Sequence, residues 1–421
     1  MLLASWLLMA CEPSPEANVV GYLIARQLGT FDVPAADRPP GAVVGRVVHG
    51  DEPVAGATVV VAERTGRPHV ARTDGAGRYR IDGLPPGQYV LSAVAAGYDE
   101  AVPRDSLGSV QLVTAPSGDV VEAPAIHLHP HQPAPLPAPL PDAVALQATA
   151  SYTATSLFPP DAAASVQAYE FTRNGVVNAN LRVYLPLDVA AGAQLPLLFI
   201  VYPGWVDGWE PVSVAFASQG FAVVAISPAA AWGTDIDAHV LDARVALNLA
   251  ADGLLGPHID AERAVALGGS FSSAILHRLL RDEGDRFAAW VTAGGIGDAF
   301  AAAEDFYAGR SEMPDQYEYL VPSLGPPNLY PLNFLRYSPL YTADQLPPTL
   351  IIHTAADRIL PISQAMALEE ALVAAGVPVA VFYYEDVSHY LQIDEQMTDA
   401  GREMFWRIVD FAQRSLERDE P

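Results

Sequence analysis

The sequence lacks lysine entirely: its 23 basic residues other than histidine are all arginine. This absence excludes P-loop nucleotide sites, Schiff-base lysines and Ser-Lys dyads, because each needs a lysine side chain. Positive charge is also scarce, since 49 acidic residues give the 421-residue chain a formal net charge of −26. A chain without a basic stripe is unsuited to nucleic acid, and we predict no such partner. The acidic excess is more typical of solubility than of a specific partner.

The chain has one cysteine, Cys11, and therefore no internal disulfide. Cys11 follows an apolar run at residues 1–10 that is too short to cross a bilayer and ends in a small residue, as the core of a signal peptide does. Leu-Met-Ala-Cys at residues 8–11 resembles a bacterial lipobox. That resemblance implies a signal segment at 1–11, lipidation of Cys11 and a bacterial protein that is exported and attached to the cell envelope membrane. Secretion without an anchor, or a buried cysteine in an ordinary N-terminal segment, are the alternatives.

The pattern after the signal segment changes at residue 41. Residues 12–40 are rich in proline, alanine and aspartate around an apolar stretch, which predicts a tether with one short helix. From residue 41 apolar and polar residues alternate, and Gly-, Pro- and Asp-rich turns separate the alternating runs. This spacing predicts a small antiparallel β-sandwich over 41–127, with strands at 42–48, 58–62, 78–81 and 88–93.

Three motifs in this stretch carry a family resemblance. V-x-G-A-T-V-x-V, T-D-G-A-G-R-Y-R-I-D-G-L-P-P-G-Q-Y and A-A-G-Y, between residues 54 and 98, resemble the carboxypeptidase regulatory-like, transthyretin-like β-sandwich. The resemblance implies an accessory module without a catalytic centre, serving as a spacer or as a binding domain.

A proline-rich linker is predicted at 128–147, around the run P-A-P-L-P-A-P-L-P. His127, His129 and His131 stand at alternate positions where it begins, so their imidazoles could converge on a metal. We favour the other interpretation, the polar end of a last strand, and predict no metal and no cofactor.

Beyond the linker, strand-like and helix-like stretches alternate, which predicts a mostly parallel sheet with helices on both faces. The catalytic domain is predicted over 148–421. Continuous apolar runs mark buried parallel strands. Strands are predicted at 168–172, 180–185, 195–201, 221–226, 264–267, 287–292, 349–353 and 379–384, and helices at 236–251, 274–280, 363–374 and 398–416.

The stretch around Ser270 predicts a catalytic nucleophile. An apolar strand runs into Gly268-Gly269-Ser270 and an amphipathic helix follows, as in the strand–turn–helix elbow that exposes a serine on a tight turn. Ser272 stands where the usual G-x-S-x-G pattern has its last glycine, and it is small enough for such a turn.

A serine hydroxyl needs a base to take its proton, and the base needs a third group to fix its tautomer. Asp357 follows the predicted strand at 349–353, and His389 follows the one at 379–384. All three residues would meet at the carboxyl edge of the sheet, in the order Ser, Asp, His.

The motifs G-G-S-F-S-S, S-P-L-Y-T-A-D-Q-L-P-P-T-L-I-I-H-T-A-A-D-R-I-L-P and D-V-S-H resemble the α/β-hydrolase fold, in the branch of prolyl-oligopeptidase and dienelactone-hydrolase-like catalytic domains. The resemblance covers about residues 165–417. It implies Ser270 as nucleophile, His389 as general base and then acid, and Asp357 as the group that orients His389.

Several neighbouring residues have alternative roles. Ser272 or Ser273 could be the nucleophile, but neither follows the glycine pair. His353 is more typical of a loop-stabilising histidine than of a base. Asp386 could replace Asp357, but it lies too close to His389 in the same loop.

The oxyanion hole is the least determined part of the predicted site. The family implies one backbone donor at Phe271 and a second in the loop after the strand at 195–201. There the chain has Tyr202-Pro203-Gly204-Trp205, so the second donor is Gly204 or Trp205, because proline has no N–H. The Tyr202 hydroxyl could add a donor or serve only for packing.

Residues 301–341 interrupt the alternation and are rich in Pro, Tyr and Phe, which predicts either a cap that shapes an apolar acyl pocket or a loop packed on the sheet edge. We predict a serine hydrolase of carboxylic esters acting on small, accessible substrates, because the chain has no room for the substrate-filtering propeller of prolyl oligopeptidases. A prolyl-oligopeptidase-type peptidase is the first alternative, and a non-catalytic surface binding protein on a hydrolase scaffold is the second. The residues carry no signal for an oligomeric state.

Overall fold

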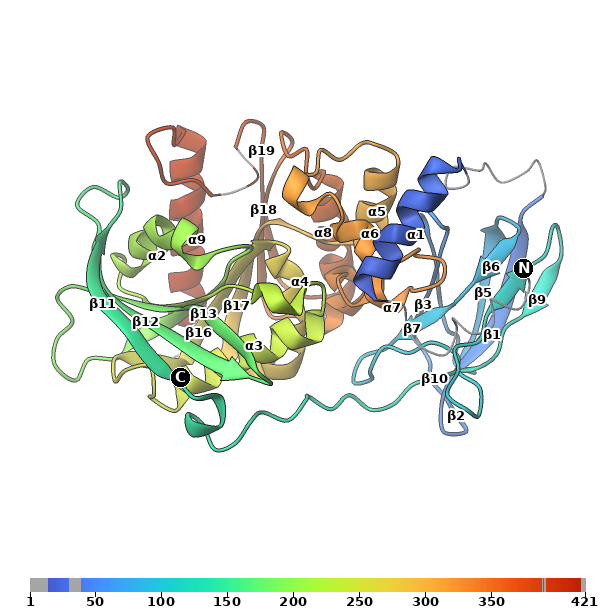
Figure 1. Ribbon diagram of the computed structural model, residues 1–421, viewed down its shortest axis with the longest axis horizontal. Helices are drawn as coiled ribbons and strands as arrows, with labels where there is room; N and C mark the ends of the chain where they lie inside the picture. Colours follow the sequence, from blue (N-terminus) through green and yellow to red (C-terminus); the bar gives the residue numbers. More distant parts are fainter. Residues whose placement is uncertain (1–13, 30–38, 388, 390, 418–421) are drawn as a thin grey trace. The chain divides into compact units, whose positions relative to one another are not determined.

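The computed structural model of the chain describes residues 14–29, 39–387, 389 and 391–417, and it divides into two compact units (Figure 1). The N-terminal unit consists of Met1–Gln132 and Asp298–Thr342, and the C-terminal unit of Pro133–Gly297 and Ala343–Pro421. Cys11 and the predicted signal segment lie outside the described residues. Within the described ranges, no helix is both long and apolar enough to cross a membrane.

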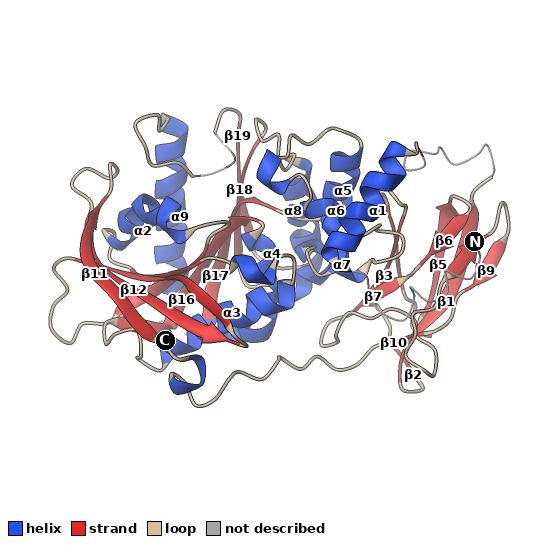
Figure 2. Cartoon of the chain, viewed as in Figure 1, coloured by secondary structure: helices blue, strands red, loops and turns tan. Residues whose placement is uncertain are grey.

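The N-terminal unit is built on short strands around one apolar core (Figure 2). β1 (Gly41–His49) pairs antiparallel with β5 (Arg78–Leu84) and parallel with β9 and β10, while β3 (Thr58–Ala62) pairs with β4 and β7 and β6 pairs with β8. Buried and exposed residues alternate along β5, as the sequence predicts. The other strands are β2 (Glu52–Pro53), β4 (Pro68–Arg72), β6 (Gly87–Tyr89), β7 (Ser92–Val94), β8 (Val113–Ala115), β9 (Val120–Glu122) and β10 (Ile126–His127).

The predicted β-rich N-terminal domain is confirmed, with four strands that the sequence did not indicate: β2, β4, β8 and β9. β4 is polar yet pairs with β3 along its whole length, and the other three are too short to show alternation. β10 lies where the sequence analysis favoured a last strand. His127 and His129 are exposed, and His131 Nδ1 lies 2.6 Å from Asp99 Oδ1. The described residues contain no group of three or more histidine, cysteine, aspartate or glutamate side chains arranged to hold a metal.

The segment predicted as a cap, 301–341, lies within the stretch that packs with the N-terminal unit. This stretch, 298–342, is here called the crossover because it links two parallel strands of the large sheet. In the tether, α1 (Pro15–Gln27) is the predicted short helix, and it packs against α6 (Figure 1). The helical elements of the crossover are α5 (Ala299–Tyr307), η5 (Asp315–Tyr317), α6 (Leu320–Ser323), α7 (Leu332–Leu335) and the start of η6 (Pro339–Gln345).

The C-terminal unit contains a nine-stranded sheet in the order β11-β12-β13-β15-β14-β16-β17-β18-β19. The first pairs are antiparallel, and every pair from β15 to β19 is parallel. The strands are β11 (Gln147–Thr155), β12 (Ala163–Arg173), β13 (Val176–Pro186), β14 (Leu195–Val201), β15 (Ala222–Ile226), β16 (Ile259–Ser270), β17 (Phe287–Gly295), β18 (Thr349–Thr354) and β19 (Val379–Tyr384).

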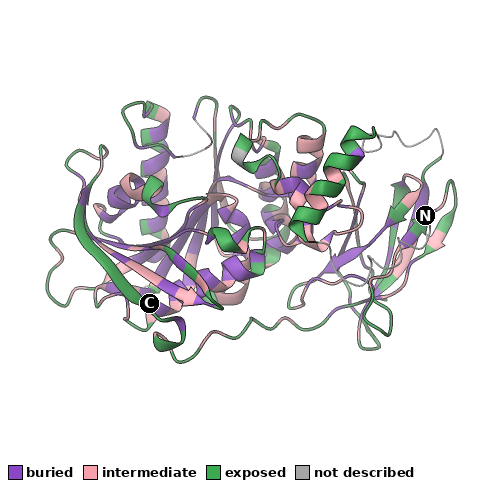
Figure 3. Cartoon of the chain, viewed as in Figure 1, coloured by how far each residue is buried: buried purple, intermediate pink, exposed green. Residues whose placement is uncertain are grey.

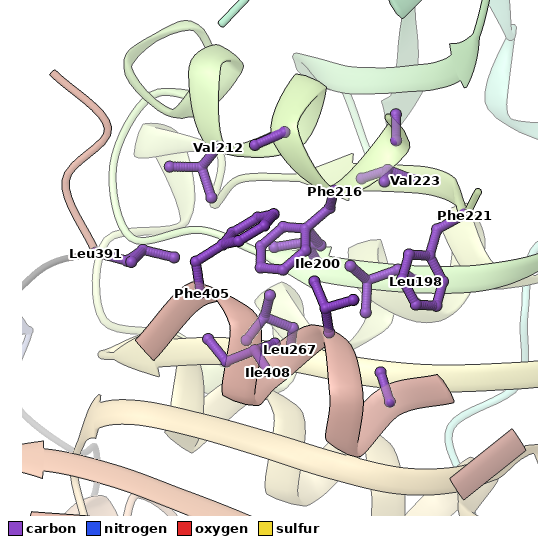
Figure 4. Packing of buried hydrophobic residues seen from close by; sticks show 14 of the residues in the cluster. Leu198, Ile200, Val212, Phe216, Phe221, Val223, Leu267, Leu391, Phe405 and Ile408 are labelled. Atoms are coloured by element: carbon purple, nitrogen blue, oxygen red, sulfur yellow. The ribbon is translucent and has the colours of Figure 1, made fainter. Parts of the chain in front are cut away.

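Helices cover both faces of this sheet, and the central strands are buried on both sides (Figure 3). α2 (Glu210–Ala217) and α9 (Asp399–Glu417) pack on one face, where Phe216 and Phe405 stack with ring centroids 4.9 Å apart above Leu198 and Ile200 (Figure 4). Each such buried side chain contributes about 1.5–3 kcal/mol. The other helical elements are η1 (Asp142–Val144), η2 (Val206–Trp209), η3 (Ala230–Trp232), α3 (Ile236–Ala251), α4 (Ser272–Glu283), η4 (Gly284–Arg286) and α8 (Ser363–Ala375).

The predicted fold class, a mostly parallel sheet with helices on both faces behind a small β-domain, is confirmed. Every predicted strand and helix of the large sheet corresponds to an observed one, although β16 and β17 extend further toward their carboxyl ends than predicted. β11 was not predicted, because eight of its nine residues are exposed and mostly small or polar. The linker joins the C-terminal unit, where the Ala134 carbonyl accepts a hydrogen bond from Arg244 Nη1 (2.5 Å).

Asp298 begins the crossover as a buried carboxylate. One carboxylate oxygen accepts a hydrogen bond from the Phe300 N–H (2.9 Å), which caps α5, and the other lies 3.2 Å from the Tyr341 hydroxyl. Burial raises the pKa of Asp298 to about 6 despite these hydrogen bonds. In the unfolded chain an aspartate titrates near pH 4.

We expect Asp298 to make folding pH-dependent between about pH 4 and pH 6. Because its folded-state pKa is raised, its contribution is fully present below pH 4 and is lost as the pH rises through 6. The loss is on the order of 3 kcal/mol. Urea unfolding of the wild type and Asp298→Asn from pH 4 to 7.5 should show the wild type losing stability relative to the variant. A difference that stays constant with pH would contradict this expectation.

Candidate active site

Ser270 lies on a strained turn between β16 and α4. Its φ is +52°, in the left-handed region that residues other than glycine rarely adopt. The turn requires small neighbours: a Cβ on Gly269 would lie 1.9 Å from the Ala293 carbonyl oxygen. A Cβ on Gly268 would lie 2.6 Å from Leu276 Cδ1 and 3.2 Å from the Ser272 Cβ. The backbone therefore has the geometry of the predicted elbow, and it accommodates serine at position 272.

Asp357 and His389 form a close pair at the ends of the neighbouring strands β18 and β19. Asp357 Oδ2 lies 2.5 Å from His389 Nδ1, and Oδ1 accepts hydrogen bonds from the N–H groups of Ile359 and Leu360, both at 2.9 Å. Burial alone would raise the pKa of Asp357. The hydrogen bonds from His353 and His389, the His389 charge and the Leu360 amide outweigh burial and hold that pKa well below its usual range.

The end of β17 joins this pair to Ser270. Ser270 pairs with Gly295 in the register of β16 and β17. On the preceding residue, Gly294, a Cβ would lie 2.8 Å from the His389 carbonyl oxygen, 3.3 Å from its Nδ1 and 3.6 Å from Asp357 Oδ2. The three predicted residues thus meet around Gly294 and Gly295. Sequence reasoning missed these two glycines, although a Gly-Gly pair at the end of an apolar strand was a signal for close approach.

The alternative residues have other surroundings. Ser272 and Ser273 are buried in α4, and Ser273 Oγ lies 2.7 Å from Thr292 Oγ1. His353 Nε2 lies 2.8 Å from the Leu360 carbonyl and 3.4 Å from Asp357 Oδ2, so it braces the loop that carries the aspartate. Asp386 is exposed.

The loop after β14 has a defined shape. The Tyr202 N–H donates to the Ile226 carbonyl (3.0 Å) and its hydroxyl lies 3.2 Å from Ser213 Oγ, so this side chain packs in the core. Trp209 stacks on Tyr202 at 4.9 Å and donates from Nε1 to the Pro203 carbonyl (3.1 Å). Gly204, at φ +87°, and Trp205 follow on the exposed part of the loop. Phe271, the other predicted donor residue, precedes α4 in helical conformation.

A mostly apolar pocket, partly open to solvent, lies beside His389. Among the residues that the structure describes, no carboxylate, guanidinium or amine side chain lines it, and the titratable groups in its lining are His389 and the core residue Tyr202. It reaches from the Ser270 strand to α2 and α9. Its lining consists of Tyr202, Pro203, Trp209, Val212, Leu267, Gly268, Gly269, Ala293, His389, Leu391 and Ile408.

Two family models match the chain. The model described as "Carboxypeptidase regulatory-like domain" matches residues 42–129, and that described as "Prolyl oligopeptidase family" matches residues 246–418, which include Ser270, Asp357 and His389. Residues 246–418 are therefore similar to the prolyl oligopeptidase family. The match covers β16 to β19 of the large sheet and supports a serine hydrolase, either a peptidase or an esterase.

Individual relatives are more distant. "Probable dipeptidyl-peptidase 5" of Emericella nidulans is 28% identical over 229 residues, which cover 48% of this chain and 29% of that protein. The chain therefore spans less than a third of this curated relative. An acylaminoacyl peptidase structure has a TM-score of 0.49 at 15% identity and covers 84% of this chain and 59% of its own. The structure of an acetyl xylan esterase from Paenibacillus sp. R4 has a TM-score of 0.45 at 16% identity, and the match covers 64% of this chain and 89% of that one.

Proposed function

We propose that the protein hydrolyses carboxylic esters through a Ser-His-Asp triad and an acyl-enzyme intermediate. The observation that carries the proposal is the 2.5 Å His389–Asp357 pair. It lies beside Gly294 at the end of β17, next to Gly295, which pairs with Ser270. A strained serine beside a histidine–carboxylate pair is the arrangement that activates a hydroxyl. The prolyl oligopeptidase-family match over these residues supports the same chemistry.

In this mechanism Ser270 Oγ attacks the carbonyl carbon while His389 Nε2 takes its proton. Asp357 keeps the Nδ1–H of His389 directed at Oδ2, which leaves Nε2 free of its proton before the attack and stabilises the imidazolium afterwards. His389 then protonates the leaving alcohol, and the ester bond breaks to give the acyl-enzyme. Water, deprotonated by the same histidine, attacks the acyl-enzyme and regenerates Ser270. Because the pKa of Asp357 is held low, its carboxylate stays charged throughout.

The developing oxyanion needs two N–H donors. We assign one to Phe271, at the start of α4, where the positive end of the helix dipole also favours negative charge. The second is Gly204 or Trp205 in the loop after β14, which the Trp209–Pro203 hydrogen bond holds in place. This assignment rests on the family pattern and on the position of the loop.

Ester substrates are favoured by the pocket beside His389. Its described lining residues offer aliphatic and aromatic surface for an acyl chain, and none of them is a carboxylate that could bind the charged amino terminus of a peptide. Peptidase activity is the second candidate, because the curated relative is named a dipeptidyl-peptidase. A non-catalytic binding role on this scaffold is the third.

Export and membrane attachment through Cys11 stay predictions from residues 1–11. We expect a clickable fatty acid supplied to a bacterial expression host to label the wild-type chain, and Cys11→Ala to lose the label. Equal labelling of both chains would contradict lipidation at this position.

The first measurement is covalent labelling with a fluorophosphonate probe. We expect the wild type to be labelled and Ser270→Ala to be unlabelled, because the probe reacts only with an activated serine. Ser272→Ala is the matched control, two residues along the same turn, and should retain labelling. Labelling of Ser270→Ala, or none of a folded wild type, would exclude the assigned nucleophile.

The substrate is then resolved with p-nitrophenyl esters of increasing acyl length beside a Gly-Pro p-nitroanilide. Turnover of the esters without the anilide supports the esterase proposal, and preference for the anilide supports the peptidase alternative. If the probe labels Ser270 but neither the esters nor the anilide are hydrolysed, the protein is still a serine hydrolase, and its substrate carries a different leaving group.

Asp357→Asn is expected to lower kcat by about 10³–10⁴-fold, because the amide no longer holds the productive tautomer of His389. Asp386→Asn, in the His389 loop, is the control and should leave kcat within about twofold of wild type, since that carboxylate is exposed. Steady-state kinetics on the best ester checks both. A large loss in the control with little in Asp357→Asn would move the orienting role to Asp386.

A further inference from the structure

The crossover packs within the N-terminal unit. It links β17 to β18, yet its contacts group it with residues before and within the β-domain. Inside it, Phe300 stacks on Phe334 at 5.5 Å and meets Tyr341 edge-on at 6.1 Å. Its contacts with the rest of this unit are with described residues between 14 and 132.

The β-domain approaches the first helix of the crossover at Gly66. Gly66 has φ +109°, and a Cβ there would lie 2.5 Å from the Phe300 carbonyl oxygen and 2.6 Å from the Glu304 backbone nitrogen. Both are main-chain atoms, so neither can move aside without moving α5. Contact this close leaves room only for glycine.

Asn328 of the crossover meets the free edge of β6. The Val90 N–H donates to the Asn328 carbonyl (2.8 Å), and Asn328 Nδ2 donates to the Gln88 carbonyl (2.9 Å). One asparagine thus satisfies two neighbouring groups of the strand edge, as a paired strand would. Nearby, Arg336 lies 3.9 Å from the buried carboxylate of Glu100.

α1 contacts the crossover at a third point. Asn18 Nδ2 donates to the Ser323 carbonyl (3.0 Å), and a Cβ on Gly325 would lie 3.1 Å from Asn18 Nδ2. Tyr22 and Tyr307 approach with ring centroids 5.7 Å apart. Residues before and within the β-domain therefore hold both the first and the middle parts of the crossover.

The crossover begins three residues after the active-site glycines. Gly295 pairs with Ser270, Gly294 contacts His389, and the Gly297 N–H donates to Gln364 Oε1 (3.0 Å). Asp298 then caps α5 and contacts Tyr341, near the far end of the crossover. A shift of α5 would be passed directly along the backbone to the glycines beside the triad.

We propose that the N-terminal β-domain holds the crossover as an intramolecular partner and, through it, positions Gly294–Gly297 beside Ser270 and His389. The β-domain is then a positioning element for the hydrolytic reaction and more than a spacer. The kinetic part of this inference rests on the proposed function; the structural part does not.

Gly66→Ala in the full chain tests the inference. The added methyl group should separate the β-domain from α5, whereas Gly56→Ala, also at positive φ (+72°) but with nothing within 4 Å, adds backbone strain alone. Asn328→Ala is a milder second variant that removes only the bond to Gln88. We expect Gly66→Ala, and to a smaller extent Asn328→Ala, to increase amide hydrogen exchange in 298–342 and in 291–297.

The kinetic readout separates positioning from general loss of stability. We expect kcat and the fluorophosphonate labelling rate of Gly66→Ala to fall about 10- to 100-fold, with KM within about twofold, because a displaced catalytic geometry costs rate more than binding. Gly56→Ala should keep the wild-type exchange in both segments and the wild-type kcat.

Wild-type exchange in the crossover of Gly66→Ala would overturn the inference, and so would increased exchange there with unchanged kcat. If the wild type reacts with neither probe nor ester, the proposed function fails separately. In that case amide exchange in 291–297 tests the structural part of the inference. Unchanged exchange there in both Gly66→Ala and Asn328→Ala would overturn it.

Discussion

The close approach of β16 to β17 is the constraint on which the rest of this active site depends. Ser270 is at φ +52°, a conformation that costs of order 1–3 kcal/mol in a residue with a side chain. The strain is sustained because β16 lies in the middle of the nine-stranded sheet, paired with both β14 and β17. Glycine at 294 leaves the space beside the His389–Asp357 pair, and glycines at 268, 269 and 295 allow the close approach of the turn, β17 and α4.

The electrostatics of the site follow from the same crowded edge. Asp357 is buried, and a buried carboxylate would normally become neutral. Two amide N–H groups on one oxygen and two histidines near the other reverse that tendency, so the charge is retained where it orients His389. His353 contributes through the Leu360 carbonyl, which fixes the loop that supplies one of those amides.

Local pattern was sufficient to predict the large sheet and the candidate triad. Continuous apolar runs mark β14 to β19, and the order of Ser270, Asp357 and His389 along the chain follows from placing each at a strand end. What local pattern could not predict was long-range. Asn328 satisfies the edge of β6 across 240 positions of sequence, and β11 is polar because it lies at the sheet edge. The packing of 298–342 with the N-terminal unit depends on such long-range contacts, which produce no periodic pattern of apolar residues in the sequence.

The β-domain and the crossover each lack something that the other provides. A β-domain of short strands leaves backbone donors and acceptors open along its edges, and an open edge invites pairing with other chains. A crossover made mostly of brief helical turns depends on tertiary packing, because short helices are marginal on their own. Asn328 covers part of the edge of β6, and the surface around Gly66 receives α5. Since the crossover is continuous with Gly294–Gly297, the proposed positioning role would couple the stability of the β-domain to the geometry beside Ser270.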